Sequence, residues 1–164
     1  MSINTNKIIH FDNINDLKKQ LSKKTQSTVL TGGCFDIIHI GHIQFLTRAK
    51  QLGDILIVLV ESDESVSAKK GNNRPFNTQI DRATVLAALA VVDYVILLPH
   101  AMDDSKYDRL VTGLKPAIIA TTKDDPYIHH KQRQSKLIHA HVVEVVDRIK
   151  NISTSTLSEI IGID

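Results

Sequence analysis

Residues 33–42 read Gly-Cys-Phe-Asp-Ile-Ile-His-Ile-Gly-His. Residues 28–30, just before them, are Thr-Val-Leu, a β-branched and apolar run that is typical of a short strand. After them, Ile43, Leu46 and Ala49 recur at helical spacing. Where a strand becomes a helix through glycines, the backbone can approach a ligand closely, and the helix start offers unpaired N–H groups and a positive dipole end. The stretch therefore predicts a phosphate-binding turn between a strand and a helix.

His39 and His42 stand three residues apart at the predicted helix start. Side chains at this spacing lie on one helix face, so both rings can reach the same bound group. The alternative is that the two histidines only cap the helix or lie on the surface. The complete pattern of strand, Gly32-Gly33, His-x-Gly-His and helix favours the phosphate site.

Strands and helices alternate along the chain. The predicted strands are 28–32, 54–60, 93–98, 117–121 and 141–146, and the predicted helices are 14–21, 41–52, 63–68, 78–91, 104–113, 128–138 and 154–161. Residues 55–60 are continuously apolar, which suits a parallel strand buried on both faces. This order predicts an α/β fold: a Rossmann-like, doubly wound parallel sheet of about five strands with helices on both faces. Ligands of such sheets bind at the carboxyl ends of the strands, where residues 32–42 fall.

The composition predicts a single globular domain over 1–164, with a helical lead-in over 1–27 and the Rossmann-like core over 28–161. A net charge of +2 and an aromatic content of 4% without tryptophan argue against a nucleic-acid partner. No apolar run approaches the length of a membrane span, and no signal-peptide core opens the chain. Cys34 is the only cysteine, which excludes an internal disulfide and predicts a cytoplasmic location. For Cys34 itself, a small packing residue is favoured over a nucleophile.

These motifs resemble those of the cytidylyltransferase-like nucleotidyltransferases. Residues 33–42 look like the His-x-Gly-His signature of that superfamily, and residues 74–95 resemble the adenylyltransferase domain of heptose-1-phosphate enzymes. Residues 148–155, Arg-Ile-Lys-Asn-Ile-Ser-Thr-Ser, are similar to a motif of glycerol-3-phosphate and choline-phosphate cytidylyltransferases. The resemblance covers most of residues 27–161. It implies transfer of a nucleoside monophosphate from a nucleoside triphosphate to a phosphorylated acceptor, with release of pyrophosphate.

The resemblance implies catalytic roles for His39, His42 and Arg148, since ring N–H donors and a forked guanidinium suit the oxygens of a triphosphate. The implied nucleotide-binding residues are Gly33, Cys34, Phe35, Gly41, His42, Arg148, Ile152, Ser153, Thr154 and Ser155. The last three also suit plain capping of the predicted helix 154–161, and the two roles are compatible.

The implied acceptor-binding residues are Asp36, Lys69 and Arg82. Asp36 is expected to order the phosphate turn by accepting backbone N–H bonds, with a bound metal as the alternative. Lys69 and Lys70 are predicted to lie in a loop, where the alternative is a pair of solvated charges. Arg82 either points toward the acceptor or lies on a helix surface. Residues 71–75, Gly-Asn-Asn-Arg-Pro, are predicted to form a mobile loop that folds over the acceptor.

Mg²⁺ is implied as a companion of the triphosphate, and no protein metal ligands are predicted. Four histidines, at 129, 130, 139 and 141, raise a zinc site as an alternative. Adjacent histidines on a helix point about 100° apart, so this alternative is not favoured.

The predicted function is therefore a nucleotidyltransferase that uses ATP on a small phosphorylated acceptor such as a sugar 1-phosphate. The choice between ATP and CTP stays open, because residues 120–125 lack the Gly-Asp pairing usual where these families frame the base. The alternatives are a cytidylyltransferase for glycerol 3-phosphate or another polyol phosphate, a flavin-mononucleotide adenylyltransferase, and a non-catalytic nucleotide-binding regulator. Any kinase that supplies the acceptor is expected to be a separate protein, and a homodimer is left open.

Overall fold

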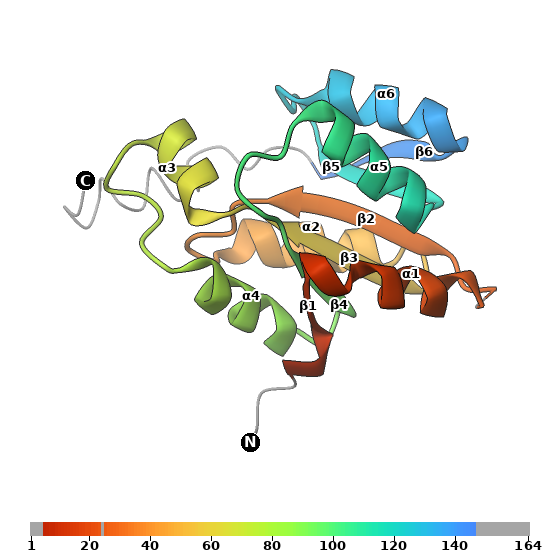
Figure 1. The fold of residues 1–164 in the computed structure, drawn as a ribbon, viewed down its shortest axis with the longest axis horizontal. Coiled ribbons are helices and arrows are strands. Elements are labelled where there is room, and N and C mark those ends of the chain that lie inside the picture. The colour runs from red at the N-terminus through yellow and green to blue at the C-terminus, as the bar shows by residue number, and fades with distance from the viewer. Residues whose placement is uncertain (1–4, 24, 147–164) are drawn as a thin grey trace.

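The computed structural model describes residues 5–23 and 25–146. Its centre is a six-stranded parallel sheet with the order β1-β4-β3-β2-β5-β6 (Figure 1). The strands are β1 (Ile8–His10), β2 (Thr28–Gly33), β3 (Ile55–Val60), β4 (Tyr94–Leu97), β5 (Ile118–Thr122) and β6 (His141–Val146). The predicted doubly wound parallel sheet is confirmed.

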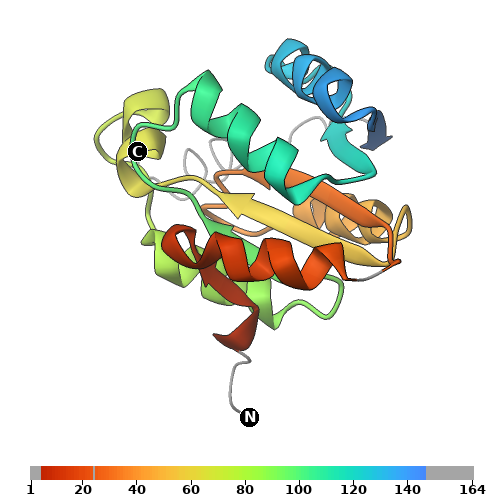
Figure 2. The same cartoon turned by 45° about the vertical axis from the view of Figure 1, so that its right-hand side comes forward.

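Helices cover both faces of the sheet. They are α1 (Ile14–Ser22), α2 (Ile40–Lys50), α3 (Asp63–Lys70), α4 (Gln79–Ala88), α5 (Asp104–Leu114) and α6 (Ile128–Ile138), with short 3-10 turns at Thr5–Lys7 and Phe11–Asn13. The helices α2 and α4 pack on one face, and α1 and α5 pack on the other with α6 beside α5 (Figure 1, Figure 2). Within the described part of the chain, no helix combines the length and apolarity needed to cross a membrane.

Strand β3 shows why its sequence is continuously apolar. Leu56, Val58 and Val60 point into the core under α2 and α4, whereas alternate residues such as Ile57 and Leu59 point into the core under α1 and α5. All six residues of the strand are buried. A strand in the middle of a sheet that is covered on both faces needs this composition.

Several elements differ from the sequence prediction, and α4, for example, ends at Ala88 and not at residue 91. The lead-in predicted as helical also supplies β1, which pairs with β4 at one edge of the sheet. Three residues are too short a run to show a strand period, so β1 has no usable signal in the sequence. Helix α3 runs to Lys70, two residues beyond the prediction, and therefore takes in Lys69. The predicted helix 154–161 lies outside the described residues.

The topology places the site at β2. The chain moves from β2 to β3 and β4 on one side, and then returns to β5 and β6 on the other. The strand order therefore reverses between β2 and β5, and a crevice for ligands is expected outside their carboxyl ends. Gly32 and Gly33 end β2 at this point, and a Cβ at Gly32 would lie 3.2 Å from Cβ of Leu59 on the neighbouring strand.

Candidate active site

A cavity of about 720 Å³ opens at the carboxyl ends of the strands. The turn between β2 and α2 lines one part of it, with Gly33 to Phe35, His39 and His42. The end of α3 lines a second part through Lys69 and Lys70, and α5 and α6 line a third. The cavity therefore joins the predicted phosphate turn to two helices that no sequence motif connects with it.

The backbone at the start of α2 fixes both histidines. His39 is the N-cap, and its Nδ1 accepts a hydrogen bond from the Gly41 N–H at 3.1 Å. The His39 N–H in turn donates to Nδ1 of His42 at 3.4 Å. The two ring centroids lie 3.9 Å apart, and both rings line the cavity. The structure thus brings the predicted pair together.

These bonds decide which ring nitrogen carries hydrogen. An Nδ1 atom that accepts a hydrogen bond has no hydrogen of its own, so the neutral ring carries it at Nε2. Burial lowers the pKa of His39. Burial, together with the charges of His39 and Lys70, lowers the pKa of His42 to about 4. Both rings are therefore neutral at pH 7, and each has one Nε2–H donor to offer a phosphate oxygen.

The turn before the histidines is held by packing. Phe35 adopts a left-handed φ of 50°, and its ring centroid lies 5.3 Å from that of His42. A Cβ at Gly33 would lie 3.1 Å from the Phe35 ring, so a side chain there would press on this contact. Burial raises the pKa of the Cys34 thiol, although the charges of Lys70 and Arg82 oppose the rise. A thiol that stays protonated at neutral pH favours the packing role of Cys34 over a nucleophilic one.

Asp36 ties the phosphate turn to the segment that precedes α4. Its carboxylate is buried and pairs with Arg74, whose Nε and Nη2 each lie 2.7 Å from Oδ2. Its Oδ1 accepts the N–H groups of Phe76 and Asn77 at 2.9 and 3.1 Å. The expected role of accepting backbone N–H bonds is observed, but the donors come from residues 76–77 and not from the turn itself. With both oxygens engaged, this geometry gives no support to an acceptor or metal contact by Asp36.

Arg74 belongs to the loop 71–75 that the sequence predicts to be mobile, yet its side chain is buried and paired. Only 6% of Arg74 is exposed, and its guanidinium stacks 4.4 Å from the centroid of the Phe76 ring. The far end of the predicted loop 71–75 is thereby anchored to the phosphate turn. The sequence carries no signal for this pair, because 38 residues separate Asp36 from Arg74.

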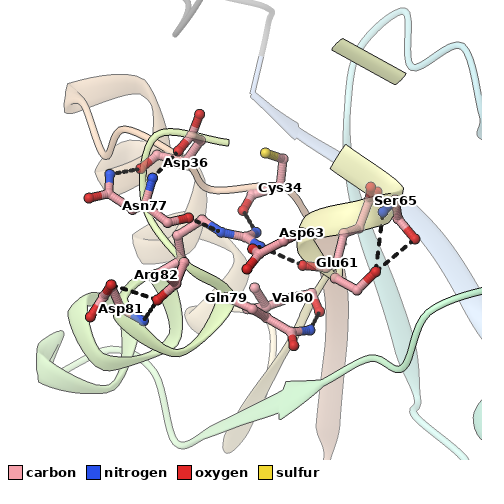
Figure 3. Close-up of polar contacts among 12 residues, drawn as sticks. Cys34, Asp36, Val60, Glu61, Asp63, Ser65, Asn77, Gln79, Asp81 and Arg82 are labelled. Carbon is pink, nitrogen blue, oxygen red and sulfur yellow. Dashed lines mark hydrogen bonds and ion pairs between the residues drawn. The ribbon is translucent and has the colours of Figure 1, made fainter. Parts of the chain in front are cut away.

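Arg82 is buried, and its guanidinium forms hydrogen bonds with several segments around the site (Figure 3). Its Nε donates to the Asn77 carbonyl at 3.1 Å, and its Nη1 donates to the Cys34 carbonyl. Its Nη2 donates to the Glu61 carbonyl and to Oδ1 of Asp63, both at 2.7 Å. The guanidinium thus joins the ends of β2 and β3 to α3 and α4. These bonds use four of the five N–H donors of Arg82, and Arg82 does not line the cavity, which favours a role in the framework of the site over an acceptor contact.

Lys69 and Lys70 lie in the last turn of α3 and not in a loop. Lys69 Nζ pairs with Oε2 of Glu61 at 2.8 Å and lies 5.5 Å from the centroid of the Tyr127 ring. Lys70 stands close enough to lower the pKa of both Cys34 and His42. The two neighbours therefore face different parts of the cavity: Lys69 faces Glu61 and Tyr127, and Lys70 faces the phosphate turn.

A polar cluster at the end of β5 adds residues that the sequence motifs do not indicate. Oγ1 of Thr121 donates to Oδ2 of Asp125 at 2.6 Å, and Lys131 Nζ donates to both residues. Burial disfavours the charge of Asp125, but the bonds from Lys131 and Thr121 outweigh it and lower its pKa. The strand order would place Thr121 beside β2, but no sequence pattern links Lys131 to it.

The carboxylates around the cavity bear on how a metal could be held. Glu61 pairs with Lys69, Asp125 with Lys131, and Asp104 with Arg133 at 2.6 Å. Among the described residues, no group of three or more His, Cys, Asp or Glu side chains is arranged to hold a metal ion. These engaged carboxylates fit an Mg²⁺ held mainly by phosphate oxygens of a bound nucleotide. Arg148 and residues 152–155, the other predicted nucleotide contacts, lie outside the described residues.

A model of the family described as cytidylyltransferase-like matches residues 30–160. The chain belongs to the cytidylyltransferase-like family. The resemblance inferred from the His-x-Gly-His stretch is confirmed, and the matched range contains the histidine pair, the Asp36–Arg74 brace and the polar cluster at β5.

Curated relatives match most of this chain. The bifunctional protein HldE of a Nitratiruptor species is 40% identical over 149 residues, which cover 91% of this chain and 30% of the relative. The HldE of Campylobacter fetus subsp. fetus is 40% identical over 151 residues, covering 92% and 30%. The chain therefore spans less than a third of the length of these relatives.

Solved structures share the fold. The lipopolysaccharide core biosynthesis protein from Thermoplasma volcanium aligns with a TM-score of 0.62 at 30% identity, over 76% of this chain and 99% of that one. A pantoate-beta-alanine ligase from Francisella tularensis aligns with a TM-score of 0.61 at 16% identity, over 88% and 69%. The second likeness concerns the fold alone.

Proposed function

We propose that the chain transfers a nucleoside monophosphate from a nucleoside triphosphate, with ATP favoured over CTP, to a phosphorylated sugar, releasing pyrophosphate. The observation that carries the proposal is the histidine pair. His39 and His42 sit at a helix start over the switch point of the sheet, and both are neutral with their Nε2–H groups free to donate. Such donors suit the oxygens of an α-phosphate as charge builds up on it.

Catalysis of this reaction depends more on positioning the reacting phosphates than on a general base. The attacking phosphate monoester is already largely dianionic at neutral pH, because its second pKa is about 6. The main obstacle to the reaction is the repulsion among the negative charges of the acceptor phosphate, the α-phosphate and the leaving pyrophosphate. Lys69 and Lys70 line the same cavity as the histidines and would offset this charge. Arg148 is proposed as the forked donor for the triphosphate, and Mg²⁺ would enter with the nucleotide to neutralise its outer phosphates.

The sugar phosphate is proposed as the acceptor because of the relatives. Both HldE proteins align over nine-tenths of this chain, and the Thermoplasma structure is named for lipopolysaccharide core biosynthesis. We further expect the reaction to take place in the cytoplasm, where nucleoside triphosphates are available. A homodimer stays a proposal that light scattering would test.

Pyrophosphate release tests the function. We expect release with ATP and Mg²⁺ in the presence of heptose 1-phosphate, and less release when CTP replaces ATP or glycerol 3-phosphate replaces the sugar. The double variant His39→Ala, His42→Ala serves as the control and should bring the rate to background. If no combination of nucleotide and acceptor releases pyrophosphate while nucleotide still binds, a non-catalytic nucleotide-binding regulator is the better description.

A further inference from the structure

Two peptide carbonyls of the phosphate turn are held by side chains from the start of α4 (Figure 3). The Cys34 carbonyl accepts a hydrogen bond from Nη1 of Arg82, and the Asp36 carbonyl accepts one from Nδ2 of Asn77 at 2.7 Å. Arg82 lies in the first turns of α4, and Asn77 comes immediately before Thr78, the N-cap of that helix. One short stretch of chain therefore fixes the turn at two points.

Both carbonyls are directed away from the cavity. Gly33, Cys34 and Phe35 line the cavity, whereas Asn77 and Arg82 are not among its lining residues. The N–H of a trans peptide points opposite to its C=O, so the Phe35 N–H points away from Arg82. A carbonyl oxygen is the negative end of the peptide dipole, and it would repel a bound triphosphate. The observed orientation keeps two such ends out of the space that a triphosphate would occupy.

Phe35 lies between the two held peptides, and its backbone needs outside support. Its φ of 50° is in the left-handed region, which a bulky residue rarely adopts. Such a conformation persists only where the surrounding structure fixes it. The bond from Arg82 fixes the peptide before Phe35, and the bond from Asn77 fixes the peptide after Asp36. Loss of either bond would let the turn relax and rotate a carbonyl toward the cavity.

Asn77 also connects the two points with each other. Its N–H donates to Oδ1 of Asp36 at 3.1 Å, and its own carbonyl accepts Nε of Arg82 at 3.1 Å. Asn77 is nevertheless an exposed residue, so its side chain does not fill the core. Its carboxamide can therefore be removed without opening a cavity in the protein, which the buried Arg82 does not allow.

We propose that Asn77 is a positioning residue of the phosphate turn, whose carboxamide holds the Asp36 carbonyl away from the bound triphosphate. Arg82 does the same for the Cys34 carbonyl. The inference rests on the proposed function, because it takes a triphosphate as the ligand of the turn. It gives a role to a residue that none of the sequence-based predictions included and that acts from outside the cavity.

Asn77→Ala tests the inference, with Asn73→Ala at an exposed position between α3 and α4 as the matched control. In calorimetric titrations with Mg²⁺ and ATP, Asn77→Ala should bind roughly 3- to 10-fold more weakly than the wild type, the scale for one hydrogen bond. Inorganic tripolyphosphate should lose affinity by the same factor. Adenosine should bind unchanged, because it brings no phosphate to the turn. Asn73→Ala should match the wild type with all three ligands.

The comparison of ligands separates a positioning role from a merely structural one. An equal loss of affinity for ATP and adenosine, or an unchanged affinity for ATP and tripolyphosphate, would overturn the inference. The titrations need no turnover, so failure of the wild type to release pyrophosphate would overturn the proposed function alone. A wild-type protein that bound ATP no more tightly than adenosine would overturn both, because the turn would then not hold a triphosphate.

Discussion

The backbone at the start of α2 fixes which ring nitrogen of His39 and of His42 carries hydrogen. A histidine that is free to titrate near pH 6.5 would change charge within the working range of most enzymes. Here both Nδ1 atoms are engaged by backbone N–H groups, and burial holds the pKa of each ring below its usual value. The pair therefore acts as two fixed neutral donors, and a triphosphate meets directed N–H groups with no proton transfer needed.

This role predicts a large catalytic effect from His42. His42→Ala should lower kcat by roughly 10²–10³-fold, the scale for loss of one preorganised donor to a developing charge. The nucleotide affinity should change far less, because the ground-state phosphate keeps its other partners. Single-turnover kinetics and calorimetry give the two values. His141→Ala, at an exposed position on β6, is the control and should be silent. A near-normal kcat for His42→Ala would remove His42 from the catalytic machinery.

The lowered pKa of His42 also predicts a pH dependence of stability. Its native value is about 4 against 6.5 when unfolded, so the unfolded state binds more protons between these values. The contribution is fully present above pH 6.5 and is lost as the pH falls toward 4, with a total on the order of 3 kcal/mol. Urea unfolding at pH 7 and pH 4.5 should show that His42→Gln loses less free energy of unfolding than the wild type, because glutamine does not titrate. Equal losses for both proteins would mean that His42 is not desolvated.

At the level of elements, the site depends on ties between segments that are far apart in the sequence. Asp36 and Arg74 join the phosphate turn to the segment before α4, and Arg82 joins two strand ends to α3 and α4. Asp36→Asn would leave the Arg74 guanidinium buried without a counter-charge. We expect a loss of about 3–5 kcal/mol in the free energy of unfolding. Asp16→Asn, which touches only an exposed ion pair, should cost less than about 1 kcal/mol in the same urea titrations.

Substitutions of the two neighbouring lysines of α3 should affect different kinetic constants. Lys69 faces Glu61 and Tyr127, so Lys69→Ala should raise the acceptor KM and leave nucleotide affinity nearly unchanged. Lys70 acts electrostatically on His42 and Cys34, so Lys70→Ala should weaken the nucleotide side instead. Initial rates at varied acceptor and varied nucleotide measure both effects. If Lys69→Ala weakens nucleotide binding alone, the end of α3 belongs to the triphosphate.

The contacts between segments that are far apart in the sequence could not be predicted from the sequence. Strands β2 to β6, the strand–turn–helix of residues 28–50 and the histidine pair follow from local periodicity and from residue types at close spacing, whereas β1 does not. The Asp36–Arg74 pair, the bonds of Arg82 and the contact of Lys131 with Thr121 depend on how distant segments pack together, and no local sequence pattern encodes such contacts. For Arg82, periodicity predicts the position in a helix but not the direction in which the guanidinium points.

Across the whole molecule, one cavity is lined both by the α2 histidines and by residues of α5 and α6, which lie on the other side of the sheet. A ligand in this cavity adds interactions between elements on opposite sides of the sheet. A bound nucleotide should therefore stabilise the entire fold, by about 2.7 kcal/mol when its concentration is one hundred times Kd.

Arg148 links this whole-molecule effect to a single side chain. If its forked guanidinium holds the triphosphate, Arg148→Lys should reduce the ATP-induced rise in melting temperature, because a point charge replaces a two-pronged donor. The ligand-free melting temperature should stay the same, and turnover should fall. Arg109→Lys, at an exposed position on α5, provides the control and should keep the full ATP response. Melting curves with ATP and with CTP measure the effect and also compare the two nucleotides. An Arg148→Lys protein that responds to ATP like the wild type would place Arg148 away from the triphosphate and leave the histidines and lysines to hold it.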